Sequence, residues 1–222
     1  MDLGGGSGKL SNYFIQKGFK SICYDFSENM RKYANENFPN ISFILDDILN
    51  IKNHFRTNSI EGITAMYTLF HIPKENINQL FMDINSVLKE NGLFCFSLQL
   101  GNGEKFVDEP YLKEKGKNVL YMNYFTRNQI YDLLSKSNFD IIYKTEKHET
   151  GDNVIGEDGN DAIYIIAKKR KWIKWQTMME SLEKSYLTGG SEFKKTTTQS
   201  AEKSTFLLKR LLHIYKKYYC FK

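Results

Sequence analysis

In residues 1–170, short stretches of mostly apolar residues alternate with longer segments in which apolar and polar residues are mixed. Between the short apolar stretches, apolar residues recur at helical spacing, as in 77–88, where Asn91-Gly92 follows the stripe. Ser27 stands where it can cap another helix. This alternation predicts repeated βαβ units, and therefore a parallel sheet with helices on both faces. The short apolar stretches predict strands buried on both faces: 21–24, 41–45, 60–67 and 93–100.

The pattern changes after residue 100. Residues 101–116 are rich in glycine and charge, which predicts a loop. Thr126 and Gln129 have the spacing of a capping box, which opens a helix. Two further strands are expected over 139–145 and 162–167. Because a short turn-rich segment joins them, we expect them to be antiparallel, which makes the sheet mixed.

Charge separates the last part of the chain from the rest. The whole chain carries a net charge of +5, but residues 1–170 hold 20 basic and 22 acidic side chains, whereas residues 171–222 hold 11 and 4. We expect 171–222 to be a basic helical extension with a flexible, polar stretch over 189–204. Its last segment is either an amphipathic helix packed on the domain or a partner, or a basic face that contacts nucleic acid or a membrane surface.

Composition narrows the class of protein. Apolar residues make up 41% of the chain, yet no run has the roughly 18–20 uncharged apolar residues of a transmembrane helix. Cys23, Cys95 and Cys220 are scattered without a CxxC pair, and no His/Asp cluster has metal-ligand spacing. We therefore expect a cytoplasmic protein without a disulfide framework or a metal site.

The strongest chemical signal is the run Asp2-Leu3-Gly4-Gly5-Gly6-Ser7-Gly8-Lys9. A strand end, a glycine-rich turn and a helix start form a cradle in which the backbone closely approaches a ligand. A mononucleotide P-loop is excluded, because Leu3 and Leu10 occupy two of its required positions. For the dinucleotide motif, the third glycine comes one residue early. The compact spacing after an acidic residue is typical of S-adenosylmethionine (SAM) sites, where Asp2 can accept a hydrogen bond from the ligand's ammonium group.

Acidic residues follow the next two predicted strands. Asp25 lies about 20 residues past the glycines, where a carboxylate can accept hydrogen bonds from ribose hydroxyls. Its alternative role is a helix cap or a surface turn. Asp47 can accept a hydrogen bond from an adenine amino group, or lie in a solvated loop. The fourth strand ends in Tyr67-Thr68-Leu69-Phe70-His71-Ile72-Pro73, at the sheet edge where such folds bind ligands.

Taken in order, these motifs resemble the class I SAM-dependent methyltransferases, over residues 1–170. The resemblance also rests on residues 88–93, similar to the turn before the family's fifth strand, and on 101–104, 124–126 and 133–139, similar to its small-molecule branch. It implies an α/β fold: a Rossmann-like, doubly wound, three-layer αβα domain whose mostly parallel, seven-stranded sheet has one antiparallel strand. It also implies SAM as cofactor, with the following contact residues: Asp2, Gly4, Gly5, Gly6, Ser7, Gly8, Asp25, Phe26, Met30, Asp47, Ile48, Tyr67 and Leu69.

The chain departs from the family pattern at both ends. Family members carry several tens of residues before the glycine loop, so we expect this sequence to be N-terminally truncated. The basic extension 171–222 is not part of the pattern either. A truncated first strand leaves two non-enzymatic alternatives open: a non-catalytic remnant that binds SAM weakly or not at all, or a partner-dependent subunit that another chain completes.

Catalysis and the methyl acceptor are less constrained. His71 is the candidate general base, with a structural histidine as its alternative, and Tyr121, Tyr124 and His148 are candidate acceptor contacts. Residues 67–70 lack the Asn/Asp-Pro-Pro-aromatic motif of amino-group nucleic-acid methylases, and no cysteine follows a proline. These observations favour a small-molecule acceptor. An RNA or protein methyltransferase docked through the basic tail stays open, and the sequence does not indicate an oligomeric state.

Overall fold

A computed structural model describes residues 1–108, 119–149 and 160–171. The chain divides into two units, Met1–Arg170 and Lys171–Lys222. The predicted helical extension, including its polar stretch 189–204, lies outside the described residues apart from Lys171. Most of the predicted turn over 150–161 lies outside them too.

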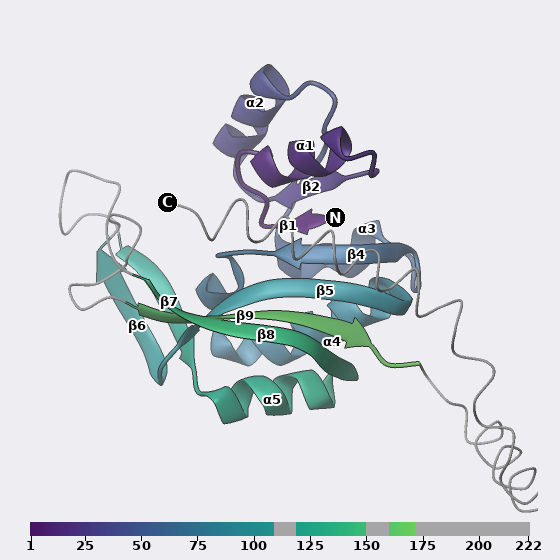
Figure 1. Cartoon of the computed structure of the whole chain (residues 1–222). Coiled ribbons are helices and arrows are strands. Elements are labelled where there is room, and N and C mark those ends of the chain that lie inside the picture. Colours follow the sequence, from purple (N-terminus) through teal and green to yellow (C-terminus); the bar gives the residue numbers. More distant parts are fainter. Residues whose placement is uncertain (109–118, 150–159, 172–222) are drawn as a thin grey trace, which may run out of the picture. The chain divides into compact units, whose positions relative to one another are not determined.

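Strands and helices alternate through the first half of the domain, as the hydrophobic pattern predicts (Figure 1). The helices are α1 (Lys9–Gln16), α2 (Glu28–Asn37), α3 (Ile51–His54), α4 (Lys74–Val87) and α5 (Arg127–Lys136), with the short 3-10 turns η1 (Ile48–Asn50) and η2 (Leu69–His71). The strands are β1 (Asp2–Leu3), β2 (Ile22–Asp25), β3 (Ser42–Leu45), β4 (Ile60–Ala65), β5 (Leu88–Leu100), β6 (Gly103–Asp108), β7 (Val119–Phe125), β8 (Phe139–Glu149) and β9 (Asn160–Lys169).

The described residues form one mixed sheet of nine strands. Strands β3, β2, β1, β4 and β5 are adjacent in that order and parallel. Strand β9 runs antiparallel to both β5 and β8, which confirms the expected antiparallel pair at the end of the domain. The Rossmann-like, doubly wound prediction is therefore confirmed. The carboxyl ends of β1, β2 and β4 meet at one edge, which is where such sheets bind ligands.

The segment after β5 is a strand, so the predicted loop over 101–116 is wrong for its first part. Strand β6 pairs antiparallel with β7, and the last two residues of β5 pair parallel with β7. Side chains of β6 alternate, since Val107 packs inward whereas Phe106 is 73% exposed. Continuous apolar runs indicate strands that are buried on both faces, and a charged strand with only one buried face does not produce such a run. The hairpin of β6 and β7 therefore adds two strands to the seven-stranded sheet that the family resemblance implies.

Two smaller expectations also need correction. Strand β3 is not buried on both faces, because it is the edge strand and its Leu45 is 41% exposed. The apolar stripe over 77–88 is helical only to Val87, and Leu88 begins β5. The capping interactions are confirmed, since Ser27 accepts a hydrogen bond from the Met30 amide and Thr126 forms a capping box with Gln129.

Helices cover the two faces of the sheet differently. The main hydrophobic core lies between one face and helices α3, α4 and α5, and it includes Leu3, Phe94 and Phe96. In Figure 1, α4 and α5 lie together against this face. Helix α1 packs on the opposite face, where Ser11 contacts Asp2, a residue that points away from Leu3. The sheet therefore separates two helical layers, as the three-layer prediction requires.

Candidate functional site

The glycine loop joins β1 to α1 and packs tightly against the end of β4. Gly4 has a φ of 67°, and its N–H donates to the Tyr24 carbonyl oxygen at 2.8 Å. A Cβ atom on Gly4 would lie 2.1 Å from Thr68 Oγ1, which is far inside van der Waals contact. Only glycine fits here, because any side chain would push the loop away from β4.

Asp25 is hydrogen-bonded to the glycine loop at Gly6, on the side of the loop that faces open space. Its Oδ2 accepts a hydrogen bond from the Gly6 N–H at 2.9 Å, and its Oδ1 accepts one from the Ser27 N–H, also at 2.9 Å. A Cβ on Gly6 would meet no atom within 4 Å, so this part of the loop faces open space. The helix cap of α2 is Ser27, not Asp25. The glycine loop and Asp25, on which the SAM interpretation chiefly rests, are thus brought together at the loop's open side.

Asp2 lies beneath the loop and is 3% exposed. Thr64 Oγ1 donates to Asp2 Oδ1 at 2.7 Å, and Ser11 Oγ donates to Oδ2 at 3.4 Å. Burial raises the pKa of this carboxyl to about 6, although the hydrogen bond from Thr64 favours the ionised form. A Cβ on Gly5 would lie 2.8 Å from Asp2 Oδ2, so the backbone passes directly over the carboxylate.

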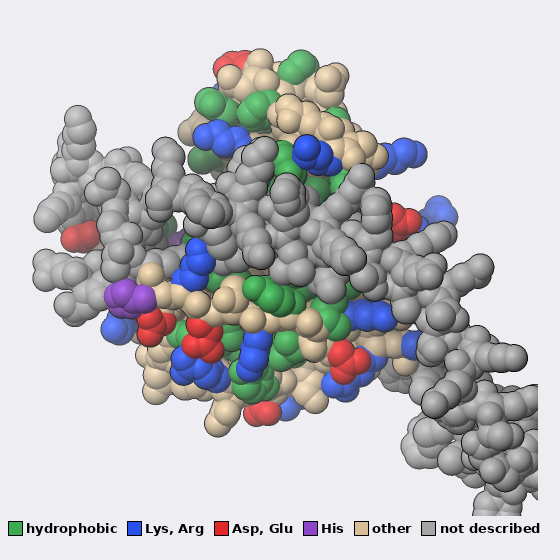
Figure 2. All heavy atoms as spheres, viewed as in Figure 1, with side chains coloured by type: hydrophobic (Ala, Val, Ile, Leu, Met, Phe, Trp, Pro, Cys, Tyr) green, Lys and Arg blue, Asp and Glu red, His purple; other side chains and the backbone are tan. Residues whose placement is uncertain are grey.

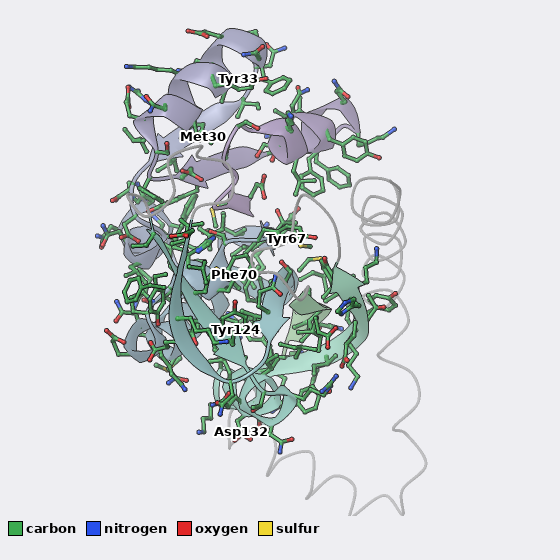
Figure 3. The ribbon with its side chains drawn as sticks, turned by 90° about the vertical axis from the view of Figure 1, so that its left-hand side faces the viewer. Met30, Tyr33, Tyr67, Phe70, Tyr124 and Asp132 are labelled. Carbon is green, nitrogen blue, oxygen red and sulfur yellow. The ribbon has the colours of Figure 1, made fainter. Side chains whose placement is uncertain are left out.

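Apolar side chains stand exposed beside Asp25. Phe26 is 77% exposed and Met30 is 43% exposed. Tyr33, one turn further along α2, is 44% exposed, and Figure 3 shows it beyond Met30 on the same helix. Asp47 is also exposed and caps η1 by accepting a hydrogen bond from the Leu49 N–H at 2.9 Å. An exposed apolar surface next to Asp25, the carboxylate that is predicted to bind ribose, is suited to packing against an adenine ring.

The other predicted cofactor contacts are less accessible. Ile48 and Leu69 belong to the main core, so their side chains point away from the loop's open side. Gly8 is buried and begins α1 with a φ of 77°, whereas Ser7 is half-buried. For Ile48 and Leu69, only the backbone is available to a ligand.

The backbone turns sharply at the carboxyl end of β4. Tyr67 has a φ of 56°, which is rare for a side chain of this size. Its N–H donates to Ser97 Oγ at 2.8 Å, and its hydroxyl lies 2.5 Å from the hydroxyl of Tyr164. These two bonds hold Tyr67 in the unusual conformation, which is a recognised feature of functional sites.

His71 follows on η2 and is held by the hairpin. Its Nδ1 lies 2.9 Å from the carbonyl oxygen of Tyr121. Because a carbonyl oxygen only accepts, Nδ1 carries the proton of the neutral ring and Nε2 is the acceptor nitrogen. The Phe70 ring packs against the imidazole at 4.5 Å between centroids. The arrangement suits a base that takes up a proton at Nε2.

The three predicted acceptor contacts lie in different surroundings. Tyr121 is half-buried and donates its hydroxyl to Glu104, and desolvation together with this bond raises its pKa to about 12. Tyr124 is buried in a small cluster with Phe70. His148 is 58% exposed on β8 and pairs with Asp161 at 2.7 Å. The structure brings the two tyrosines to η2, whereas His148 is tied to β9.

Sequence reasoning missed several polar residues near the site. Thr64, Ser97 and Gln99 are buried side chains on the strands that end there. The available signal was a polar residue within a run of apolar ones, which indicates a required hydrogen bond or a binding role. Lys105 was missed because its strand had been interpreted as a loop.

Comparisons with known proteins agree with this geometry. Residues 1–92 match the family model described as a methyltransferase domain. The chain is 24% identical over 134 residues to a protein of Alkaliphilus oremlandii described as an uncharacterized methyltransferase, which covers 60% of this chain and 56% of that protein. It superposes on a SAM-dependent methyltransferase from Methanosarcina mazei with a TM-score of 0.66 and 17% identity, over 77% of this chain and 92% of that chain.

The sequence match to the methyltransferase domain covers residues 1–92, and the fold of the described domain is similar to that of SAM-dependent methyltransferases. A further similar structure is a 1,6-didemethyltoxoflavin-N1-methyltransferase from Burkholderia thailandensis, with its substrate and S-adenosylhomocysteine bound. Its TM-score is 0.57 at 16% identity, over 77% of this chain and 70% of that chain. The chain spans about half the length of the curated relatives that it matches.

The face of the described domain that Figure 2 shows mixes charges of both signs. Figure 2 shows basic and acidic side chains interspersed on one face, in the region of β8 and β9. Ion pairs there include Arg127 with Glu146 and Arg170 with Asp140. Within the residues that the structure describes, no helix has the length and apolar character needed to cross a membrane.

Proposed function

We propose that this protein binds SAM at the glycine loop and transfers its methyl group to a small-molecule acceptor. The observation that carries the proposal is the pair of hydrogen bonds that Asp25 accepts, one from the Gly6 N–H at the loop's open side and one from the Ser27 N–H. Each carboxylate oxygen has a second lone pair that can accept from a ribose hydroxyl. A phosphate ligand would be repelled by the same carboxylate, so the chemistry favours a sugar there.

The surrounding residues fit the remaining parts of SAM. Phe26 and Met30 offer apolar surface to the adenine, and Asp47 offers a carboxylate to its amino group. Asp2 lies below the loop, where its negative charge attracts the ammonium group of the methionine moiety. Gly4, Gly5, Ser7 and Gly8 shape the cradle.

Methyl transfer needs few catalytic groups. When bound, SAM supplies an activated methyl group: the acceptor's lone pair bonds to the methyl carbon while the carbon–sulfur bond breaks and its electrons remain on sulfur. The protein's task is to hold the acceptor in line and exclude water. His71 Nε2 takes the proton that the acceptor loses, and its Nδ1–H bond to Tyr121 keeps the ring oriented.

Two observations support a small molecule as acceptor. The mixed charges on the face that Figure 2 shows are typical of a solvated face and not of one that binds a polyanion. A similar structure is that of an enzyme whose named substrate, 1,6-didemethyltoxoflavin, is a small molecule.

The buried free thiols of Cys23 and Cys95 fit a reducing compartment, so we propose that the protein is cytoplasmic.

A second candidate is an RNA or protein methyltransferase docked by the basic tail. It rests on the excess of basic residues in 171–222, which carry 11 basic and 4 acidic side chains. Binding through phosphates weakens steeply as salt rises, whereas binding of a small neutral molecule does not. A salt titration of acceptor binding therefore separates the two candidates.

The proposal is tested by titrating S-adenosylhomocysteine into the purified 222-residue chain by calorimetry. Asp25→Ala is expected to weaken binding at least tenfold, because it removes both the carboxylate and the Gly6 contact. The matched control is Asp132→Ala on α5, which Figure 3 places far from Met30 and Tyr67. Absence of binding by the folded wild-type protein would refute the proposal and favour a non-catalytic remnant. An equal effect of the two variants would refute the role of Asp25.

A further inference from the structure

The β6–β7 hairpin carries a lysine to the carboxyl end of the sheet. Lys105 pairs in register with Met122, and its Nζ lies 5.4 Å from the centre of the Tyr124 ring. Within residues 1–108, 119–149 and 160–171, this ammonium group has no carboxylate partner. A lysine held over an aromatic face keeps its charge available to an anion.

Tyr124 also lies beside a buried amide with an unused acceptor. Gln99 is 4% exposed, and no donor among the described residues forms a hydrogen bond with its Oε1. Gln99 pairs in register with Tyr124 on the parallel strand β7, so both side chains lie on the same face of the sheet. A buried acceptor without a donor costs about 1–3 kcal/mol, so Gln99 Oε1 is suited to accept a hydrogen bond from a water or a ligand.

Aromatic rings connect this pair to the end of β4. Phe70 packs with Tyr124 and Met122, and the Tyr67 ring lies 6.5 Å from the Phe70 ring, edge to face. Figure 3 shows Tyr67, Phe70 and Tyr124 following one another along the sheet. Tyr67 is 37% exposed, so part of this aromatic surface is open to a ligand. A cation and an unused acceptor therefore lie next to Tyr124, and Phe70 links this ring to His71, whose imidazole lies 4.5 Å from the Phe70 ring.

We propose that these residues select an aromatic carboxylate that bears a ring hydroxyl or amino group as the methyl acceptor. The Lys105 ammonium binds the carboxylate, and the exposed part of Tyr67 contacts the ring. Gln99 Oε1 accepts the hydrogen bond of the ring substituent, which orients the acceptor, whereas His71 Nε2 faces a separate nucleophilic group that receives the methyl. The inference rests on the proposed function, because it names the acceptor of that site. A cationic amine would be repelled by Lys105, and an acceptor without a donor would leave Gln99 unpaired.

Four probes of similar size test each element separately. They are 4-hydroxybenzoate, benzoate, 4-hydroxybenzamide and tyramine, titrated by calorimetry with and without saturating S-adenosylhomocysteine. We expect 4-hydroxybenzoate to bind at least tenfold more tightly than benzoate, which lacks the donor, and than 4-hydroxybenzamide, which lacks the charge. Tyramine is expected to bind most weakly. Equal affinities, a preference for tyramine, or no binding of any probe would overturn the inference.

Variants assign the preferences to residues. Lys105→Met should lower the affinity for 4-hydroxybenzoate about tenfold and leave that for 4-hydroxybenzamide unchanged, and Lys105→Arg should restore it. The matched control is Lys144→Met, which removes a lysine 4.7 Å from the Tyr131 ring on another part of the sheet. An equal loss in Lys105→Met and Lys144→Met would contradict the role of Lys105.

Gln99→Leu should abolish the preference for 4-hydroxybenzoate over benzoate without lowering the urea midpoint of unfolding, because the lost acceptor has no partner in the free protein. An unchanged preference, or a loss of folding stability in its place, would mean that Gln99 is only structural and would overturn its part. S-adenosylhomocysteine binding keeps the two proposals distinguishable. Intact cofactor binding without a probe preference sinks the acceptor assignment alone, whereas lost cofactor binding sinks the proposed function.

Discussion

Replacing Asp2 by asparagine isolates the effect of one buried charge on folding. The carboxyl is 3% exposed and lies under the glycine loop, where burial raises its pKa from 3.8 to about 6. The folded protein therefore keeps the proton up to about pH 6, whereas the unfolded chain releases it near pH 3.8. Between these values the folded state binds more protons, so the contribution of Asp2 to stability falls as pH rises.

The size of the effect follows from the two pKa values. One unit of pKa difference corresponds to about 1.4 kcal/mol, so the full loss is about 3 kcal/mol once the pH is well above 6. About 2 kcal/mol of it falls between roughly pH 4.5 and 7.5, the range in which urea unfolding is practical. Asparagine does not titrate, so the variant lacks this loss.

The assay is urea unfolding of the wild-type protein and Asp2→Asn at several pH values. Altered hydrogen bonds to Thr64 and Ser11 add a constant difference that does not depend on pH. The stability of the variant relative to the wild type should therefore rise by about 2 kcal/mol from roughly pH 4.5 to 7.5. A flat difference across this range would refute the claim that Asp2 is a desolvated carboxylate.

Three further predictions concern the loop, the core and the base. Gly4→Ala should lower the free energy of unfolding by about 1–3 kcal/mol in urea, because the new Cβ would collide with Thr68. Gly6→Ala should cost clearly less, because a Cβ at Gly6 would meet no atom within 4 Å. Equal losses in the two variants would contradict this reasoning. Lys169→Met should cost about 3 kcal/mol in the same assay, because the buried ammonium donates three hydrogen bonds; an unchanged midpoint would contradict it. His71→Asn should lower turnover about 10²-fold with unchanged S-adenosylhomocysteine affinity, and unchanged turnover would exclude its role as base.

Local patterns were sufficient for the alternating part of the domain. The glycine run, the carboxylate at Asp25 and the cap at Ser27 depend on neighbouring residues and on the order of strands. Parallel strands place their carboxyl ends at one edge, so the loop and Asp25 could be expected to meet before any coordinates were available. The antiparallel pairing of β8 with β9 followed from the same kind of local evidence.

Long-range pairing decided the rest. Whether residues 103–108 form a strand depends on β7, which supplies the hydrogen bonds and the buried face that their own sequence lacks. The orientation of His71 depends on a carbonyl 50 residues away, and the unused acceptor of Gln99 depends on which strand lies beside it. The sequence by itself determined the fold class and the glycine loop, because both are encoded by the spacing of nearby residues along the chain. Only the tertiary structure decided the surroundings of the acceptor residues, because contacts between distant strands leave no periodic signal in the chain.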